Sequence, residues 1–462
     1  MGRSLAYILA GSAIAFLFAS GLSLFGGLVL SHERLVAVLR AAFLADEFSA
    51  VRFPLQETFS ECAILHMQYF RARNVFLNAI DSYWIRPGEL TCTTLEGLLG
   101  LGRLAGAQFG APTSYPNYPF GARYLLAPVL SVMEFSSARM LYRIVSYGSV
   151  VILAVGAFRN SRATAIVLLP LWLILLFGFG LPVYGENVLH APGYFAGFIL
   201  LAIMLWARDW FALWQRRLFL FALLGGITTY FDGLTGSIPA NIFLAVLLNH
   251  LFYVRRLAGT LTSRRYLLRA GMEVAAVLAS FGLAYLLFAL TRIGLRSFVY
   301  AGEFSNLLHG IAHRTGAVAE GHGAITILDL PQKLWVERLI LTGSDESATA
   351  LMVCAAIGWM VAIGTVPVLW ARRQFRSLTD LLVVASCAFL IVGWYGLFLN
   401  HTYIHAWFMV RLFALIAATG FVAAAFALMQ VRAGSVDKSA ASTSQPVALP
   451  QPHDEETGCR AA

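Results

Sequence analysis

Long apolar runs separated by short polar connections occupy most of the chain, a pattern typical of a polytopic membrane protein. A transmembrane helix needs about 20 mainly apolar residues to cross roughly 30 Å of hydrocarbon. Runs close to that length occur at about 5–30, 138–158, 163–181, 193–207, 218–231, 238–254, 270–292, 348–370, 380–399 and 407–430. The sequence therefore predicts an all-α fold of about ten transmembrane helices, forming a single transmembrane domain over residues 1–430.

We expect the N-terminal end of the chain to anchor this domain in the membrane and the C-terminal end to lie outside it. Arg3 precedes an apolar run that is too long for the core of a usual signal peptide, so we expect an uncleaved anchor. Residues 431–462 are rich in Ser, Thr, Gln and Pro, which predicts a disordered cytoplasmic tail.

Composition agrees with the hydropathy pattern, because 59% of the 462 residues are hydrophobic and only 12% are charged. The positive charge behind the net +9 is concentrated in short connections between spans. These connections all fall on one side of the membrane, because successive spans cross it in opposite directions. By the positive-inside rule that side is cytoplasmic, together with both termini. The basic excess therefore reflects topology, and no nucleic-acid partner is expected. The arginines of these connections are Arg159, Arg162, Arg208, Arg216, Arg217, Arg255, Arg256, Arg264, Arg265, Arg269, Arg372, Arg373 and Arg376.

Two large loops, about 31–137 and about 293–347, lie on the opposite, exterior side. The first loop opens with the amphipathic stretch HERLVAVLRAAFLADEF and continues with a second helical run, ETFSECAILHMQYFRARNVFL. Leu35, Val38 and Leu39 recur at helical spacing, which predicts that the first stretch lies in the membrane interface.

Polar residues are distributed unevenly across the predicted membrane. Eight of the ten histidines and seventeen of the twenty-four carboxylates fall on the exterior side. Part of this excess follows from loop length, but the short exterior loops carry such residues too. We therefore expect any chemistry to be extracytoplasmic.

The last predicted span opens with NHTYIHAWFMVR, which places an arginine inside an apolar helix. Such a charge costs at least about 2.5–3.5 kcal/mol unless it is compensated. Arg411 is therefore either an anion-binding residue or half of a structural salt bridge with Asp232 or Glu186. His401 and His405, spaced i, i+4, are typical of a metal-binding pair but also of an interfacial belt of His and aromatic residues, and we assign no metal to them.

Two short exterior loops supply further candidates for substrate binding. Asp232 lies in YFDGLTGSIP, where Gly and Pro break the helix, and it either lines a cavity or caps a helix. Glu186 and His190 lie in PVYGENVLHAPG.

The first exterior loop supplies carboxylates and a pair of cysteines. Glu57 and Glu61 share one helical face, which suits either a site or a solvated surface. Cys62 and Cys92 both lie in this loop, and we expect them to form a disulfide in an oxidising compartment. The sequence contains no CxxC metal spacing, P-loop, dinucleotide-binding glycine motif or GxSxG elbow, and no cofactor is implied.

One predicted span, a long exterior loop with acidic residues, and then about nine further spans form an arrangement that resembles the GT-C superfamily of integral-membrane glycosyltransferases. The resemblance covers nearly the whole chain at the level of topology. The stretches YPNYPFGARYLLAPVLSVMEFSSARMLY, YFDGLT and HTYIHAWFMVR also look like segments of bacterial membrane proteins of GT-C appearance. Arg123, in the first of these stretches, joins the candidate substrate-binding residues.

The resemblance implies an enzyme that takes a sugar from a polyprenyl-phosphate carrier in the membrane and uses a carboxylate of the first exterior loop as its base. That role falls on Asp46, Glu47, Glu57 or Glu61, and Asp46-Glu47 is the approximate match to the acidic pair of the family. His401, His405 and Arg411 would hold the phosphate. The composition, with 31 of 33 basic residues being Arg, is typical of a GC-rich bacterium, which places the protein in a bacterial inner membrane.

Two other functions fit the same pattern. A transporter or flippase of a lipid-linked saccharide also needs cations and carboxylates in a membrane cavity, but the chain has no internal repeat. An exterior acyltransferase or a polymerase of lipid-linked oligosaccharides would instead place its essential residues in the two large loops.

Overall fold

The structure is a computed structural model that describes residues 2–48, 55–70, 76–77, 83–84, 91–110, 112–114, 121–231, 236–315, 326, 328–337 and 345–443. Within these ranges the regular secondary structure is helical apart from one short antiparallel ladder. In it, β1 (Tyr83–Trp84) pairs with β2 (Thr113–Ser114).

In the described part of the chain, seven helices are long and apolar enough to cross a membrane, so the protein is an α-helical multi-pass membrane protein. The fold class predicted from the hydropathy pattern is confirmed at that level. The seven are α1 (Gly2–Val29), α7 (Phe135–Asn160), α13 (Ser237–Asn249) with its continuation to Gly259, α14 (Ser263–Ser297), α18 (Asp345–Ala371), α19 (Phe375–Leu397) and α22 (Leu412–Thr443).

The other three predicted spans form helices that are shorter or less apolar. The segment predicted at 163–181 divides into α8 (Arg162–Val167), α9 (Leu169–Leu173) and the π-helix η1 (Ile174–Gly178). Pro170 lies in the first turn of α9, where its missing amide donor explains the break. The segments predicted at 193–207 and 218–231 correspond to α11 (Ala191–Trp206) and α12 (Trp214–Phe231).

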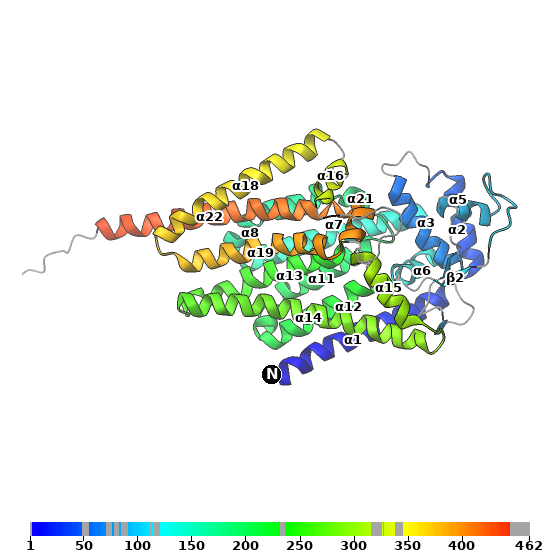
Figure 1. Cartoon of the computed structure of the whole chain (residues 1–462), viewed down its shortest axis with the longest axis horizontal. Coiled ribbons are helices and arrows are strands. Elements are labelled where there is room, and N and C mark those ends of the chain that lie inside the picture. Colours follow the sequence, from blue (N-terminus) through cyan, green and yellow to red (C-terminus); the bar gives the residue numbers. More distant parts are fainter. Residues whose placement is uncertain are drawn as a thin grey trace, which may run out of the picture.

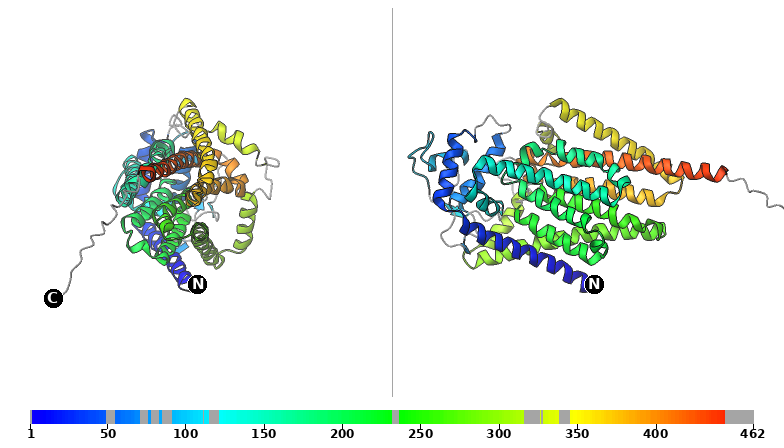
Figure 2. Two further views of the ribbon diagram at one scale, coloured as in Figure 1. Left: turned by 90° about the vertical axis from the view of Figure 1, so that its left-hand side faces the viewer. Right: turned by 180° about the vertical axis from the view of Figure 1, so that it is seen from behind.

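The long helices run side by side along the long axis of the molecule, and the helices of the first loop gather at one end (Figure 1). These are α2 (His32–Leu44), α3 (Leu55–Tyr69), α5 (Thr91–Leu98) and α6 (Ala122–Val132). The start of α14, the connection from α18 to α19 and the C-terminal part of α22 lie at the opposite end (Figures 1 and 2). Two of the arginine-rich connections are therefore far from the first loop.

The helices of the first loop pack into an apolar core that they share with α7, and α2 does not present its apolar face to lipid. Leu35, Val38 and Leu39 are fully buried with residues of α3, α5 and α6. The prediction of an interfacial helix was wrong because neighbouring helices of the same loop, together with α7, cover that face.

The second loop and the C-terminal region are also more helical than expected. The loop contains α15 (Glu303–Thr315) and α16 (Asp329–Val336). Helix α22 continues to Thr443, past residue 431 where the disordered tail was expected to begin, and its last turns are rich in Ala, the strongest helix former. Residues 444–462 lie outside the described part of the chain.

Glycines allow the long helices to approach closely, as in many membrane bundles. A Cβ at Gly11 of α1 would lie 2.4 Å from the backbone oxygen of Phe219 in α12. A Cβ at Gly225 of α12 would lie 2.6 Å from the backbone oxygen of Phe281 in α14. These contacts fix α12 between α1 and α14.

We expect Gly225→Ala to lower the stability of the solubilised protein by about 1–3 kcal/mol, because the new methyl group must push α12 and α14 apart. Gly282→Ala in α14 is the matched control, since a Cβ there meets nothing within 4 Å. Thermal melting followed by size-exclusion chromatography measures both. Equal melting temperatures for the two variants would contradict this account of the packing.

Candidate functional site

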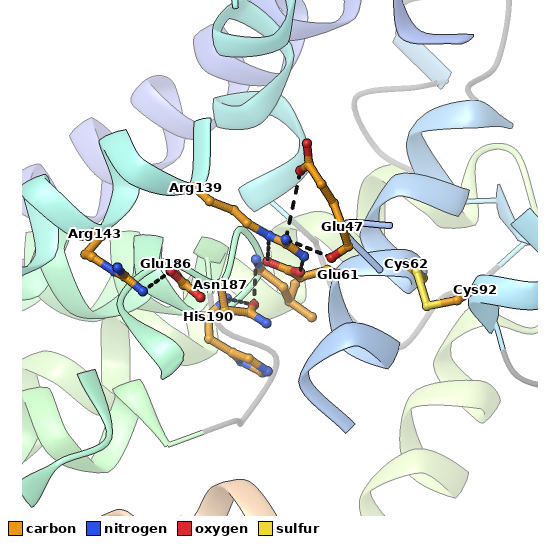
Figure 3. A network of polar contacts seen from close by, with 10 residues as sticks. Glu47, Glu61, Cys62, Cys92, Arg139, Arg143, Glu186, Asn187 and His190 are labelled. Atoms are coloured by element: carbon orange, nitrogen blue, oxygen red, sulfur yellow. Dashed lines mark hydrogen bonds and ion pairs between the residues drawn. A yellow bond between two sulfur atoms is a disulfide. The ribbon is translucent and has the colours of Figure 1, made fainter. Parts of the chain in front are cut away.

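A buried ion pair joins the first-loop unit to the bundle. Glu61 of α3 is 4% exposed and Arg139 of α7 is 6% exposed. The Arg139 Nε donates to Glu61 Oε1 at 3.1 Å, and its Nη2 pairs with the second carboxylate oxygen. Arg139 also donates through Nη1 to the backbone oxygen of Glu47 at 3.0 Å, and the Glu47 carboxylate lies 4.0 Å from that nitrogen. Figure 3 shows how Arg139 reaches both glutamates.

The segment before α11 packs against the same pair (Figure 3). The Asn187 side-chain oxygen accepts the backbone amides of Leu189 at 2.9 Å and His190 at 3.0 Å, which closes a tight turn. The backbone amide of Val188 in this turn donates to the Glu61 carboxylate. One side of the turn is held by an ion pair between Glu186 and Arg143 of α7.

Glu61 experiences two opposed effects. Burial raises the pKa of Glu61, whereas the Arg139 guanidinium and the Val188 amide favour the carboxylate and oppose this rise. Burial is the larger effect, so Glu61 is a stronger base than an exposed glutamate.

His190 connects this cluster to the beginning of the last span. Its Nε2 lies 3.3 Å from the Ser60 hydroxyl, next to Glu61 in α3. Burial lowers the pKa of His190 well below its usual value, and the nearby charges of Arg411 and His405 lower it further. His190 is therefore neutral at pH 7.

Arg411 is fully buried, and aromatic faces surround its guanidinium. Its Cζ lies 3.9 Å from the ring centre of Tyr184 and 4.6 Å from that of Tyr194, which are cation–π distances. Glu186, one of the two partners expected for Arg411, pairs with Arg143 instead.

The two histidines expected to act with Arg411 precede it in the chain, where two short helices follow each other. His401 belongs to α20 (Leu399–Ile404), and His405 separates α20 from α21 (Ala406–Met409). Their ring centres are 4.6 Å apart. Among the described residues no group of three His, Cys, Asp or Glu side chains has the geometry of a metal site.

Three predicted site residues are placed away from this cluster or only partly described. Asp46 is exposed and adopts a left-handed backbone conformation (φ 58°) that ends α2. Glu57 lies one turn before Glu61, but its side chain is outside the described part. Asp232 falls outside the described residues altogether.

Arg123 is fully buried in α6, at the other end of α3 from Glu61. Its Nη1 donates to the backbone oxygen of Met67 at 3.3 Å, and its Nη2 contacts the Tyr124 hydroxyl. The described contacts of Arg123 hold α6 to α3.

A disulfide joins Cys62 and Cys92, the pair expected from the sequence. It links α3 to α5 at the residue that follows Glu61, so the carboxylate sits on a helix that is covalently fixed (Figure 3).

Arg139, Arg143 and Asn187 were not among the residues singled out from the sequence. The two arginines lie one turn apart at the start of a predicted span, and charged residues in a span need buried partners. That spacing was the available signal. Asn187 carried no signal, because its role depends on the turn that it closes.

A second polar network lies in the bundle, away from the first loop. Glu273 of α14 forms an ion pair with Arg217 at 3.2 Å and a second ion pair with Arg269. Asp380 of α19 accepts from His250 at 2.8 Å and from Tyr266. These contacts neutralise two buried carboxylates and tie α12, α13, α14 and α19 together.

Compared with known proteins, the chain matches no protein-family model, no curated protein and no solved structure.

We expect Arg139→Gln to destabilise the protein by about 3–5 kcal/mol, because it leaves the buried Glu61 carboxylate without its cation. Arg143→Gln is the matched control. Its side chain is 42% exposed, and its ion pair with Glu186 contributes about 0–1 kcal/mol. Thermal melting of both variants tests this, and a double variant with Glu61→Gln should recover part of the Arg139→Gln loss. A larger loss in the Arg143 variant would contradict the assignment.

His66 of α3 makes the stability of the first-loop unit sensitive to acid. It is fully buried, neither ring nitrogen has a hydrogen-bond partner in the described structure, and burial lowers its pKa to about 4. An unfolded histidine titrates near pH 6.5, so the unfolded chain binds more protons between these values. His66 therefore leaves folding stability undiminished above pH 6.5, and it lowers that stability increasingly as the pH decreases toward 4.

At pH 5 the protonation of His66 in the unfolded chain lowers the free energy of unfolding by roughly 2 kcal/mol. We expect His66→Phe to reduce the loss of melting temperature between pH 7 and pH 5. The same loss in wild type and variant would show that another group carries the acid sensitivity.

Proposed function

We propose that this protein is an integral-membrane glycosyltransferase of GT-C type, which moves a sugar from a polyprenyl-phosphate carrier to an acceptor on the exterior side of a bacterial inner membrane. The observation that carries the proposal is a buried carboxylate, Glu61, held by Arg139 where the first-loop unit meets the bundle. The proposal includes ten spans, with both termini cytoplasmic, which would put α11, α12 and the α8–η1 segment across the membrane.

In this proposal Glu61 is the general base, with Glu47 beside the same arginine. Burial raises the pKa of Glu61, so its carboxylate is better matched to taking a proton from a hydroxyl group. To do so it would exchange one hydrogen bond from Arg139 for one from the acceptor. Arg139 keeps the carboxylate oriented through its remaining contacts.

The transfer step is a single displacement. Glu61 takes the proton of the acceptor hydroxyl, and the acceptor oxygen forms a bond to the anomeric carbon of the sugar. The bond between that carbon and the phosphate oxygen breaks, and its electrons leave with the polyprenyl phosphate.

Arg411, with His401 and His405 before it in the chain, is proposed to hold the departing phosphate. A guanidinium between two aromatic faces is weakly hydrated and fixed in place, so it can neutralise charge without reorganising. His190 lies between Arg411 and α3 and would link the phosphate side of the site to the base side.

We expect Glu61→Gln to lower sugar transfer by about 10²–10⁴-fold, because general-base catalysis contributes rate factors of that size. The assay measures labelled sugar transferred in membranes from a panel of polyprenyl-phosphate donors, at matched expression. Glu134→Gln is the control, since Glu134 is an exposed carboxylate whose ion pair with Arg34 lies on the surface. Donor binding should persist in the Glu61 variant and weaken in Arg411→Gln.

Wild-type membranes that consume no donor would overturn the enzyme assignment. If labelled lipid then crosses sealed vesicles in a way that depends on Arg411, the protein is a transporter of a lipid-linked saccharide. If transfer occurs but Glu61→Gln retains it, the base is another carboxylate of this end of the molecule.

A further inference from the structure

An apolar groove of about 660 Å³ lies between α14, α18 and α19, far from Glu61 along the bundle. Its walls include Trp359, Ile363 and Trp370 of α18 and Leu382 and Ala385 of α19. Arg264, in the first turn of α14, completes the lining at the end where the arginine-rich connections lie. The volume is in the range of protein sites that bind small molecules, about 300–1,000 Å³.

The groove is open on its side, and its apolar residues are not covered by the described chain. Ile363 is 64% exposed, Trp370 is 65% exposed and Leu382 is 61% exposed. All three helices that form the groove are long and apolar enough to span a membrane, so these side chains face hydrocarbon rather than water. The molecules that surround such a surface are lipids.

Positive charge is in excess at this end of the groove, where Arg264 lines it and further arginines occur next to Arg264 and between α18 and α19 in the sequence. Five arginines, at the start of α14 and in the segment from the end of α18 to the start of α19, form no ion pair with a described carboxylate. Where their contacts are described, they are with backbone oxygens: Arg376 donates to Leu261 at 2.5 Å, and Arg372 donates to Val431 at 2.8 Å. The five are Arg264, Arg265, Arg372, Arg373 and Arg376.

The nearest buried carboxylate of α19 does not offset this charge. Asp380 is already bonded by His250 and Tyr266 and lies 3.4 Å from Arg255. The five arginines therefore attract an anion from outside the chain, and a phosphate group matches the geometry of a guanidinium.

We propose that this groove binds an anionic phospholipid, with one acyl chain between α18 and α19 and the phosphate against Arg264. Basic residues at the membrane surface next to a gap between spans are a recognised arrangement for anionic head groups. Trp370 lies near the end of α18, at the depth where tryptophan is enriched in membranes. This site is independent of the proposed transferase activity.

The test uses native mass spectrometry of the full chain, purified in detergent and mixed with equal amounts of phosphatidylglycerol and phosphatidylcholine of the same acyl chains. Wild type should retain phosphatidylglycerol in preference. Arg264→Gln should lower this preference about fivefold, the factor expected for one basic residue at an anionic surface. Ala385→Trp, which fills the groove and leaves every charge in place, should remove one tightly held phosphatidylglycerol.

Arg162→Gln is the matched control, because Arg162 is an exposed arginine at the start of α8 that does not line the groove. It should leave the preference unchanged. The proposal is overturned if wild type retains both lipids equally, if either groove variant behaves as wild type does, or if Arg162→Gln lowers the preference as much as Arg264→Gln. Sugar transfer is not part of the readout, so failure of the transferase assignment does not affect this result.

Discussion

The ion pair between Glu61 and Arg139 is a buried charge contact between the helices of the first loop and the transmembrane bundle, within an apolar core that the two parts share. Both side chains are almost fully buried, so neither can lose the other without leaving an unpaired charge in apolar surroundings. The pair therefore fixes the position of α3 on α7. The disulfide from Cys62 to Cys92 and the turn closed by Asn187 then hold the surrounding segments against it.

The same constraint explains where the other buried charges lie. Glu273 and Asp380, inside the bundle, are each bonded to cationic or hydrogen-bonding side chains from neighbouring helices. Arg411 lies against tyrosine faces, which stabilise its guanidinium. In each case a polar group within apolar helices is tolerated because tertiary contacts compensate it. Conversely, the arginines around the groove near Arg264 have no described carboxylate partner, and there a lipid phosphate is the available anion.

The candidate site draws on segments that are far apart in the sequence. Glu61 comes from the first loop, Arg139 from the second span, His190 from the turn before α11, and Arg411 from the start of the last span. The proposed reaction needs rigid neighbours around these residues, because small displacements would weaken both proton transfer and phosphate binding. The covalent link beside Glu61 and the stacked environment of Arg411 provide that rigidity at the two sides of the site.

Several features were determined by the sequence alone because they depend on local pattern. Apolar runs of membrane-spanning length identified the helical membrane fold, and helical spacing in the first loop identified α2 and α3. Other features required the tertiary structure. Leu35 and its neighbours are buried by helices of the same loop, not by lipid, and the partner of Glu61 is Arg139, an arginine 78 positions away. Amphipathic spacing shows that a face must be covered, but not what covers it, and a charge in a span shows that a partner is needed, but not which residue provides it. Those choices depend on how distant helices pack.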